Sequence, residues 1–118
     1  MPDAIESLML ANLLEVFGQR DPAIRRQVID RIFAADVVFS DPEGLVTGRD
    51  AIDGKAQAVL DAAPGFVFSP AGPAQVSNDL GYLTWNFGPE GQDPVVRGID
   101  IGLVSDGQLS KVYTLIVG

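Results

Sequence analysis

The chain has 118 residues, of which 47% are apolar and 20% charged, a composition typical of one folded globular domain. Its 16 acidic and 8 basic side chains give a net charge of -8, which argues against nucleic acid or an anionic membrane surface as a partner because both require basic patches. The absence of histidine and cysteine excludes Ser-His-Asp and Cys-His catalysis and the usual zinc sites.

Any acid–base chemistry must therefore use carboxylates, tyrosines or the two lysines. We expect no metal and no cofactor. No apolar run approaches the roughly 20 residues of a membrane-spanning helix, and the N-terminal `MPDAIESLML` lacks the positive flank of a signal peptide. These features predict a cytoplasmic protein with a single domain over residues 1–118.

Three helices are predicted in the first half of the chain. Apolar residues follow helical spacing over 5–17, and a second helix begins at the Asp-Pro pair 21–22, a typical N-cap and first position. The strand `DVVFSD` (36–41) and the turn `PEG` come next. A third helix follows `TGRDAI` and ends before Pro64.

From Gly65 onward the pattern changes to strands separated by turn residues. The expected strands are 65–69, 73–78, 80–88, 94–105 and 109–117. Helices followed by a run of antiparallel strands indicate an α+β fold in which the helices cover one face of a sheet.

The last two strands are apolar on both faces, although the helices suffice to cover only one face of a sheet. This pattern predicts a homodimer that associates through the outer sheet face. The alternative is that the chain curls back to cover that face itself.

One carboxylate stands out inside the strand `VVRGIDIGLV`. Side chains alternate along a strand, so the nearest neighbours of Asp100 on its own face are Gly98 and Gly102. An apolar setting raises the pKa of a carboxyl, and the glycines predict space for a ligand beside it. The alternative is a structural ion pair with Arg97, which requires a bulge at Gly98 because a spacing of three places the two residues on opposite faces.

A second carboxylate ends the strand `VVFSDP`. Asp41 shares a face with Val37 and Phe39, so it also points toward the predicted core. Two nearby carboxyls would titrate as a pair and supply one base and one acid. The alternative is that Asp41, which precedes Pro42, forms an ordinary Asx turn.

Three segments, in this order after the first helices, resemble the SnoaL-like branch of the NTF2-like superfamily: `FAADVVFSDPEGLVTGRDAI`, `TWNFGPEG` and `RGIDIGLVSDGQLSKVYTLIVG`. The resemblance runs from about Leu8 to the C-terminus. It implies an NTF2-like cone, in which three N-terminal helices pack on a strongly bent antiparallel sheet and enclose an apolar pocket, usually in a homodimer formed through the outer sheet face.

Within this superfamily the chain resembles ketosteroid isomerase at two sites. `DPEG` matches the turn that carries the general base, which makes Asp41 the expected base, and `GID` matches the strand with the protonated oxyanion-hole aspartate, which is Asp100 here. By position, the residues expected to line the substrate pocket are Phe17, Leu83, Trp85, Phe87, Val112, Thr114 and Ile116.

Departures from these relatives narrow the expected activity. The isomerase uses a tyrosine on its first helix as second oxyanion donor, where `LLEVF` offers only Leu13 or Phe17. Because losing one such donor typically costs roughly 10²–10³ in rate, steroid isomerisation itself is not expected. SnoaL-type polyketide cyclases pair their aspartate with a histidine that this chain lacks. The Asp-Arg-Asp set of limonene epoxide hydrolase would need Arg97 on the face of Asp100.

The sequence therefore supports a cofactor-free acid–base enzyme of the isomerase, polyketide cyclase or hydrolase type, with Asp41 and Asp100 as catalytic residues. Its substrate would be a small apolar molecule such as a ketone, polyketide or terpenoid. Two alternatives remain open on the same fold. One is a non-catalytic protein that binds a hydrophobic ligand. The other is a dimeric interaction module whose pocket is filled by Trp85 and Phe87.

Overall fold

The computed structural model describes residues 3–117. Its helical segments are α1 (Ala4–Ala11), the π-helix η1 (Asn12–Phe17), α2 (Pro22–Ile32) and α3 (Arg49–Ala62). Its strands are β1 (Phe33–Asp41), β2 (Gly44–Thr47), β3 (Phe66–Pro70), β4 (Gln75–Ser77), β5 (Leu80–Pro89), β6 (Val96–Ser105) and β7 (Gln108–Ile116). No helix within the described range is long and apolar enough to span a membrane.

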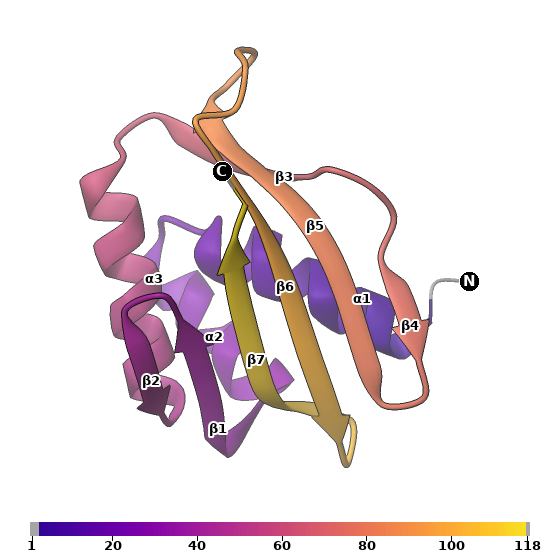
Figure 1. The fold of residues 1–118 in the computed structure, drawn as a ribbon. Helices are drawn as coiled ribbons and strands as arrows, with labels where there is room; N and C mark the ends of the chain where they lie inside the picture. The colour runs from indigo at the N-terminus through magenta and orange to yellow at the C-terminus, as the bar shows by residue number, and fades with distance from the viewer. Residues whose placement is uncertain (1–2, 118) are drawn as a thin grey trace.

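The strands form one curved sheet in the order β2-β1-β7-β6-β5-β3, and β4 also pairs with β5 (Figure 1). All neighbouring strands are antiparallel except β1 and β7, which are parallel. The predicted α+β class is confirmed. The sheet is mixed rather than wholly antiparallel, because β1 pairs with β2 on one side and runs parallel to the C-terminal strand β7 on the other.

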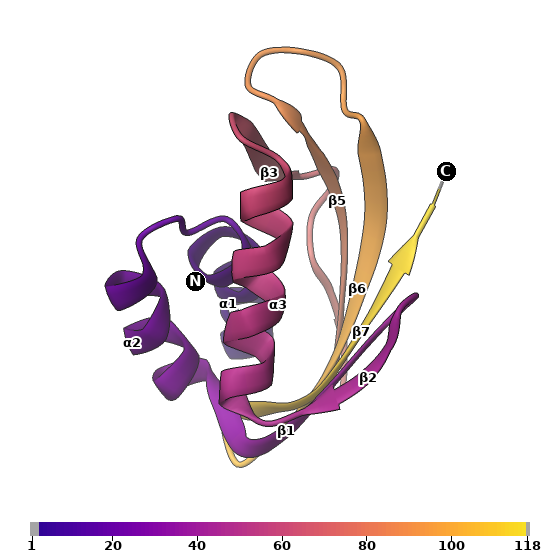
Figure 2. The same ribbon diagram turned by 90° about the vertical axis from the view of Figure 1, so that its left-hand side faces the viewer.

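The helices lie on the concave side of the bent sheet, as Figure 2 shows. The α1 helix packs against β5 and β6, α3 packs against β1, and α2 lies against η1 and α3. Apolar side chains from the helices and the concave face form one continuous core. The helices therefore cover a single face of the sheet, as the sequence predicted.

The helix starts follow ordinary capping chemistry. The Asp3 carboxylate accepts a hydrogen bond from the backbone N–H of Ile5 at 2.8 Å, and the Asp21 carboxylate accepts one from Ala23 at 2.9 Å. These bonds satisfy backbone donors that have no partner within the helix. Pro22 occupies the first position of α2, where no N–H is needed.

The first predicted helix is in fact two segments, because the backbone widens into a π-helix from Asn12 onward. Four of the six residues of η1 are buried: Asn12, Leu13, Val16 and Phe17. Such π-turns are rare and are found frequently at functional sites. Here the wider turn directs both a polar amide and an aromatic ring toward the concave face of the sheet.

One strand was absent from the sequence prediction. The segment Gly44–Thr47 forms β2 and pairs with β1 through a tight turn after Asp41. It has only four residues, and its burial pattern is mostly exposed, so no alternating apolar signal marks it. This hairpin brings the end of β1 close to α3.

Candidate functional site

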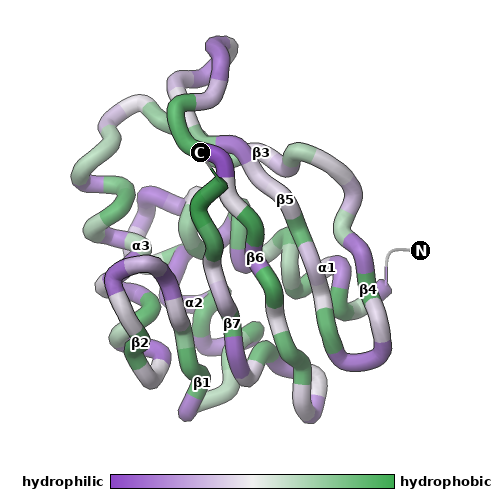
Figure 3. The backbone as a smooth tube through the Cα atoms, in the orientation of Figure 1, coloured by the Kyte–Doolittle hydropathy of each residue, from purple (hydrophilic) through white to green (hydrophobic). Residues whose placement is uncertain are grey.

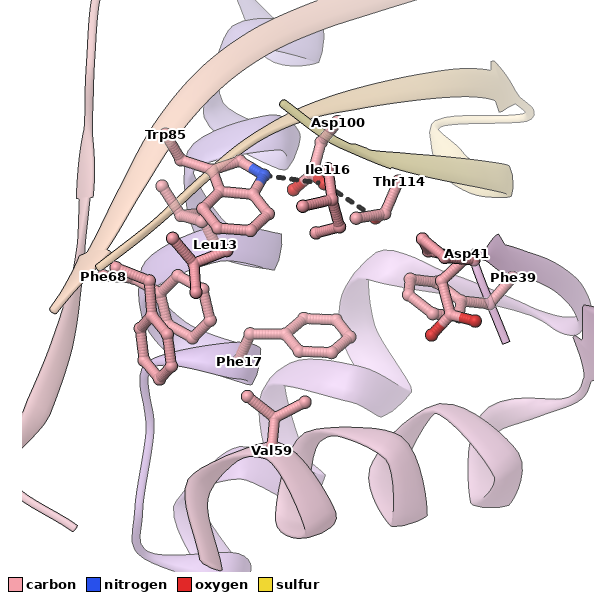
Figure 4. Close-up of a pocket in the computed structure, with 13 residues that line it drawn as sticks. Leu13, Phe17, Phe39, Asp41, Val59, Phe68, Trp85, Asp100, Thr114 and Ile116 are labelled. Carbon is pink, nitrogen blue, oxygen red and sulfur yellow. Dashed lines mark hydrogen bonds between the residues drawn. The ribbon is translucent and has the colours of Figure 1, made fainter. Parts of the chain in front are cut away.

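A cavity of about 220 Å³ lies between η1, α3 and the concave face of the sheet (Figure 4). Its lining residues are Leu13, Phe17, Phe39, Asp41, Pro42, Val59, Phe68, Trp85, Phe87, Val96, Asp100, Thr114 and Ile116. Five of these side chains are aromatic, and the only polar ones are two aspartates and a threonine. The cavity is therefore an apolar site with a few polar groups, which is the usual character of a small-molecule site.

Both predicted catalytic aspartates line this one cavity, as do five of the predicted pocket residues: Phe17, Trp85, Phe87, Thr114 and Ile116. Leu83 and Val112 do not. They are 0% and 1% exposed and belong to the closed core. Val112 is the register partner of Gly102, and Met9 of α1 packs directly over that glycine, so helix and sheet leave no space there.

Asp100 is held by three hydrogen-bond donors from three separate elements. The Thr114 hydroxyl of β7 donates to Oδ1 at 2.7 Å, and the Trp85 indole N–H of β5 donates to Oδ1 at 3.0 Å (Figure 4). The Asn12 amide of η1 donates to Oδ2 at 3.2 Å. Asp100 itself is only 4% exposed. Its carboxyl is therefore fixed in position while one side of it faces the cavity.

Burial raises the pKa of Asp100 from 3.8 to about 6, because the charged carboxylate loses its water. The hydrogen bonds from Thr114, Trp85 and Asn12 favour the charged form and limit the rise. The group consequently ionises near pH 6. It is predominantly a carboxylate at neutral pH, and a modest change in its surroundings would protonate it.

The two glycines beside Asp100 do not leave space for a ligand, so that interpretation of the sequence was wrong. A Cβ atom on Gly98 would lie 2.1 Å from Cζ2 of Trp85, and one on Gly102 would lie 2.7 Å from side-chain atoms of Leu109 and Met9. Gly98 instead makes room for the indole ring that donates to Asp100.

The alternative pairing of Asp100 with Arg97 does not occur. The register between β5 and β6 is regular through Gly98, so no bulge turns Arg97 onto the inner face. Arg97 is exposed, and within residues 3–117 no salt bridge involves Asp100. The Asp-Arg-Asp arrangement that a hydrolase of the epoxide type would need is therefore not assembled.

Asp41 has quite different surroundings. The ammonium of Lys55 on α3 lies 3.2 Å from Asp41 Oδ2, and the backbone N–H of Glu43 donates to Asp41 Oδ1 at 3.0 Å. The second contact is the Asx turn that was the alternative reading of this residue. In Figure 4 the Asp41 oxygens point away from Asp100. The two carboxyls line one cavity, but they do not form a hydrogen-bonded pair.

Asn12 is a site residue that the sequence reasoning missed. It is 1% exposed, and its Oδ1 atom has no hydrogen-bond donor among the described residues. A signal was available, because position 12 follows Met9 by three and precedes Val16 by four and so lies on the apolar face of the first helix. A polar side chain on that face needs a buried partner, and here the partner is Asp100.

Replacing Thr114 with valine should raise the pKa of Asp100 above about 6, because the shortest of its three donors is lost while burial is unchanged. A carbon-detected NMR titration of the aspartate carboxyls measures this directly. Ser110→Ala is a matched control on the same strand, since that hydroxyl donates to the Leu103 carbonyl and not to Asp100. An unchanged pKa in Thr114→Val would show that the hydroxyl does not stabilise the carboxylate.

The raised pKa of Asp100 should also make the free energy of unfolding depend on pH. Between about pH 4 and pH 6 the unfolded chain ionises this carboxyl while the folded protein keeps it protonated, so its contribution to stability is full below about pH 4 and is lost as pH rises through about 6. The loss is on the order of 3 kcal/mol. Urea denaturation of wild type and Asp100→Asn measures this contribution. The difference between their free energies of unfolding should shrink from pH 4 to pH 7.5. A difference that stays constant would contradict the raised pKa.

Comparison with known proteins identifies the family and the fold of the chain. The SnoaL-like domain family matches residues 10–112. Among curated proteins there is no significant match. The fold recurs in a candidate isomerase of the SnoaL-like family from Agrobacterium tumefaciens, with a TM-score of 0.87 and 20% identity over 95% of this chain and 96% of that one.

Two further structures share the fold at lower identity. One is a candidate SnoaL-like polyketide cyclase from Jannaschia sp. CCS1, with a TM-score of 0.76 and 13% identity over 98% of this chain and 90% of that one. The other is a candidate ketosteroid isomerase from Kribbella flavida, with a TM-score of 0.74 and 16% identity over 98% of this chain and 78% of that one. The expected NTF2-like architecture is confirmed: three helices on a curved sheet that does not close.

Proposed function

Because the chain belongs to the SnoaL-like domain family, we propose that it is a cofactor-free acid–base enzyme of the isomerase or polyketide cyclase type. In this proposal Asp100 takes a proton from a carbon atom of a small, mainly hydrocarbon substrate and returns it at another carbon. One observation carries the proposal: a buried, hydrogen-bonded carboxyl faces a mostly apolar cavity.

The surroundings of Asp100 suit a general base. An acid–base group works best when its pKa lies near the operating pH, and burial brings this one to about 6. Oδ1 accepts two hydrogen bonds, whereas Oδ2 accepts only the longer one from Asn12. A carboxylate has about four acceptor positions, so Oδ2 retains capacity to accept a substrate proton.

This proposal exchanges the two roles expected from the resemblance to ketosteroid isomerase. There Asp41 was the expected base and Asp100 the protonated donor. Asp41 is bound to the Lys55 ammonium at 3.2 Å, which neutralises its charge. Asp100 has neutral donors only, and it is the carboxyl whose pKa burial moves toward neutrality. We therefore assign proton transfer to Asp100 and no step of the reaction to Asp41, which forms part of the cavity wall.

The size of the cavity limits the substrate. Its volume of about 220 Å³ exceeds the ~150 Å³ of an engineered apolar cavity that binds benzene but is below the ~300 Å³ at which pockets for drug-sized ligands begin. A substituted single ring matches this range. Leu13 and Phe17 line the wall where a steroid isomerase would carry its tyrosine, so steroid isomerisation is not proposed.

The test is exchange of substrate C–H for solvent deuterium, followed by proton NMR with a panel of single-ring ketones and imines in heavy water. We expect exchange above the buffer rate for at least one compound, with a rate that rises through about pH 6 as Asp100 ionises. Exchange that shows no such rise, or that occurs only at the buffer rate across the panel, would contradict the proposal.

Ligand binding without catalysis is the second candidate. The observation that favours it is the scarcity of donors, because Thr114 is the one lining hydroxyl and it already donates to Asp100. Saturable binding of a compound that undergoes no exchange would support this candidate. An interaction module with a filled pocket is not proposed, because Trp85 and Phe87 line an open cavity.

We also propose that the protein is a homodimer through the outer sheet face. On that face β6 and β7 place Ile99 beside Leu115 and Ile101 beside Tyr113. Leu115 is 51% exposed and Tyr113 is 37% exposed, and Figure 3 shows hydrophobic segments along β6, interrupted by hydrophilic ones, and at the C-terminal end of β7. Exposed apolar surface of this kind is typical of an interface.

Sedimentation velocity tests the dimer. Wild type should sediment with twice the chain mass, whereas Leu115→Lys should sediment as a monomer because a charge at the centre of an apolar interface loses its water. Val67→Lys is a control, since Val67 is 42% exposed but lies on β3, away from β6 and β7. A monomeric wild type would contradict the proposal.

A further inference from the structure

Asp100 is a buried carboxylate without a countercharge. Its three donors are an amide, an indole and a hydroxyl, all of them neutral. The other aspartate of the cavity, Asp41, has the Lys55 ammonium at 3.2 Å. Buried charges in proteins are ordinarily paired, because desolvating an isolated one is costly. A positive charge bound in the cavity beside Asp100 would compensate this carboxylate.

The cavity walls favour a cation over a neutral or anionic ligand. The lining includes two carboxylates and no lysine or arginine. Five aromatic side chains line the same cavity as Asp100. The Phe17 and Phe39 rings stack with centroids 5.4 Å apart, and the Phe68 and Trp85 rings pack in a T-shaped arrangement with centroids 5.3 Å apart. Ring faces attract cations, and the net charge of -8 favours their approach to the protein.

The scarcity of oxyanion donors points to the same ligand chemistry. A neutral ketone that loses a proton becomes an enolate, which needs donors aimed at its oxygen. The lining hydroxyl of Thr114 is engaged with Asp100, and the remaining lining residues apart from Trp85 and the aspartates are apolar. A cation that loses a proton becomes neutral, so its reaction needs no oxyanion donor.

We propose that the substrate is a single-ring organic cation with a positively charged N–H group, which supplies the missing countercharge of Asp100. This inference rests on the proposed function for the role of Asp100, and it names the substrate class. The N–H bond donates to Asp100 Oδ2. When Asp100 takes a proton from the carbon next to the C=N bond of a protonated imine, the C–H electron pair forms a C=C bond and the C=N electron pair moves onto nitrogen. An O–H bond forms on the carboxyl, so an ion pair becomes two neutral groups.

Few other charges influence this pairing. Asp41 shares the cavity and is neutralised by Lys55. Glu15 of η1 has a side chain 55% exposed and lies 3.9 Å from Arg31, outside the cavity. The remaining titratable side chains on the strands around Asp100 are on the outer face by strand alternation: Tyr82, Arg97, Lys111 and Tyr113. The pH dependence of cation binding should therefore follow Asp100.

Three compounds of one size and different charge test the proposal: benzylamine, benzyl alcohol and benzoate, measured by isothermal titration calorimetry with the wild-type protein. At pH 8 we expect benzylamine to bind roughly 10- to 100-fold more tightly than benzyl alcohol, the range for a hydrogen bond to a charged partner, and benzoate to bind most weakly. The preference should fall below pH 6, where Asp100 becomes protonated while benzylamine stays charged. Equal or tighter binding of benzyl alcohol at pH 8 would overturn the proposal.

Two variants locate the effect. Asp100→Asn should abolish the preference for benzylamine and leave the affinity for benzyl alcohol within about threefold, whereas Asp41→Asn should keep the preference. A preference that survives Asp100→Asn but disappears in Asp41→Asn would overturn the assignment. If Asp100→Asn does not fold, the loss of the benzylamine preference below pH 6 in the wild-type protein tests the role of Asp100 instead. Deuterium exchange is a separate readout, so selective binding of the amine without exchange in any cationic compound contradicts the proposed catalysis and leaves the ligand class supported.

Discussion

Replacing Gly98 with alanine is expected to lower the free energy of unfolding by about 1–3 kcal/mol or more and to raise the pKa of Asp100. The added Cβ would lie 2.1 Å from Cζ2 of Trp85, whose side chain is buried. The indole must then move, and its hydrogen bond to Asp100 at 3.0 Å is lost with it. Urea denaturation and a carboxyl NMR titration measure the two effects.

Gly54→Ala is the matched control for this substitution. Gly54 lies within α3, where a Cβ would meet nothing within 4 Å. Alanine there should stabilise the protein by about 1 kcal/mol through helix propensity alone, and it should leave the pKa of Asp100 unchanged. If Gly98→Ala were as stable as wild type and the pKa of Asp100 were unchanged, the position of the Trp85 indole would not depend on this glycine.

Asp100→Asn should reduce the rate of proton exchange in a bound substrate by roughly 10²- to 10⁴-fold, the usual contribution of a positioned acid–base group. The amide has nearly the same shape, so binding of a neutral ligand should persist, but it cannot take up the proton. The rate of deuterium incorporation at saturating substrate measures the loss.

Asp41→Asn provides the comparison within the same cavity. Because Asp41 is paired with Lys55 and engaged in an Asx turn, its substitution should change the exchange rate by less than about tenfold. A large loss in Asp41→Asn together with a small one in Asp100→Asn would contradict the roles assigned here and would restore the roles implied by the resemblance to ketosteroid isomerase.

Much of the fold follows from local sequence signals. The Asp-Pro pair at 21–22 begins α2, and the turns between the last strands are where glycine and aspartate predict them. The short strand β2 was missed because four mostly exposed residues give no periodic signal. The parallel pairing of β1 with β7 depends on contacts between segments far apart in the sequence, so local patterns do not determine it.

The site was predictable where one residue conflicts with its own surroundings. Asp100 was recognisable as a carboxylate inside an apolar strand. Asp41 was recognisable because it shares a strand face with Val37 and Phe39, and both aspartates line the same cavity. The partners were not predictable in the same way. Lys55 reaches Asp41 because α3 packs against β1 in the folded chain, a contact that local patterns do not reveal. Gly98 accommodates the Trp85 indole ring from the neighbouring strand. The spacing of residues along a single strand does not reveal the orientation of that ring.

Titration of the Asp100 carboxyl by carbon-detected NMR, assigned with Asp100→Asn, tests most directly whether this residue is a poised base. The structure predicts a pKa of about 6, well above the 3.8 of a free aspartate. It also predicts that saturation with benzylamine lowers that pKa, because a cation stabilises the carboxylate. A pKa near 4 in the free protein would show a solvated carboxyl and would contradict both the proposed catalysis and its assigned residue.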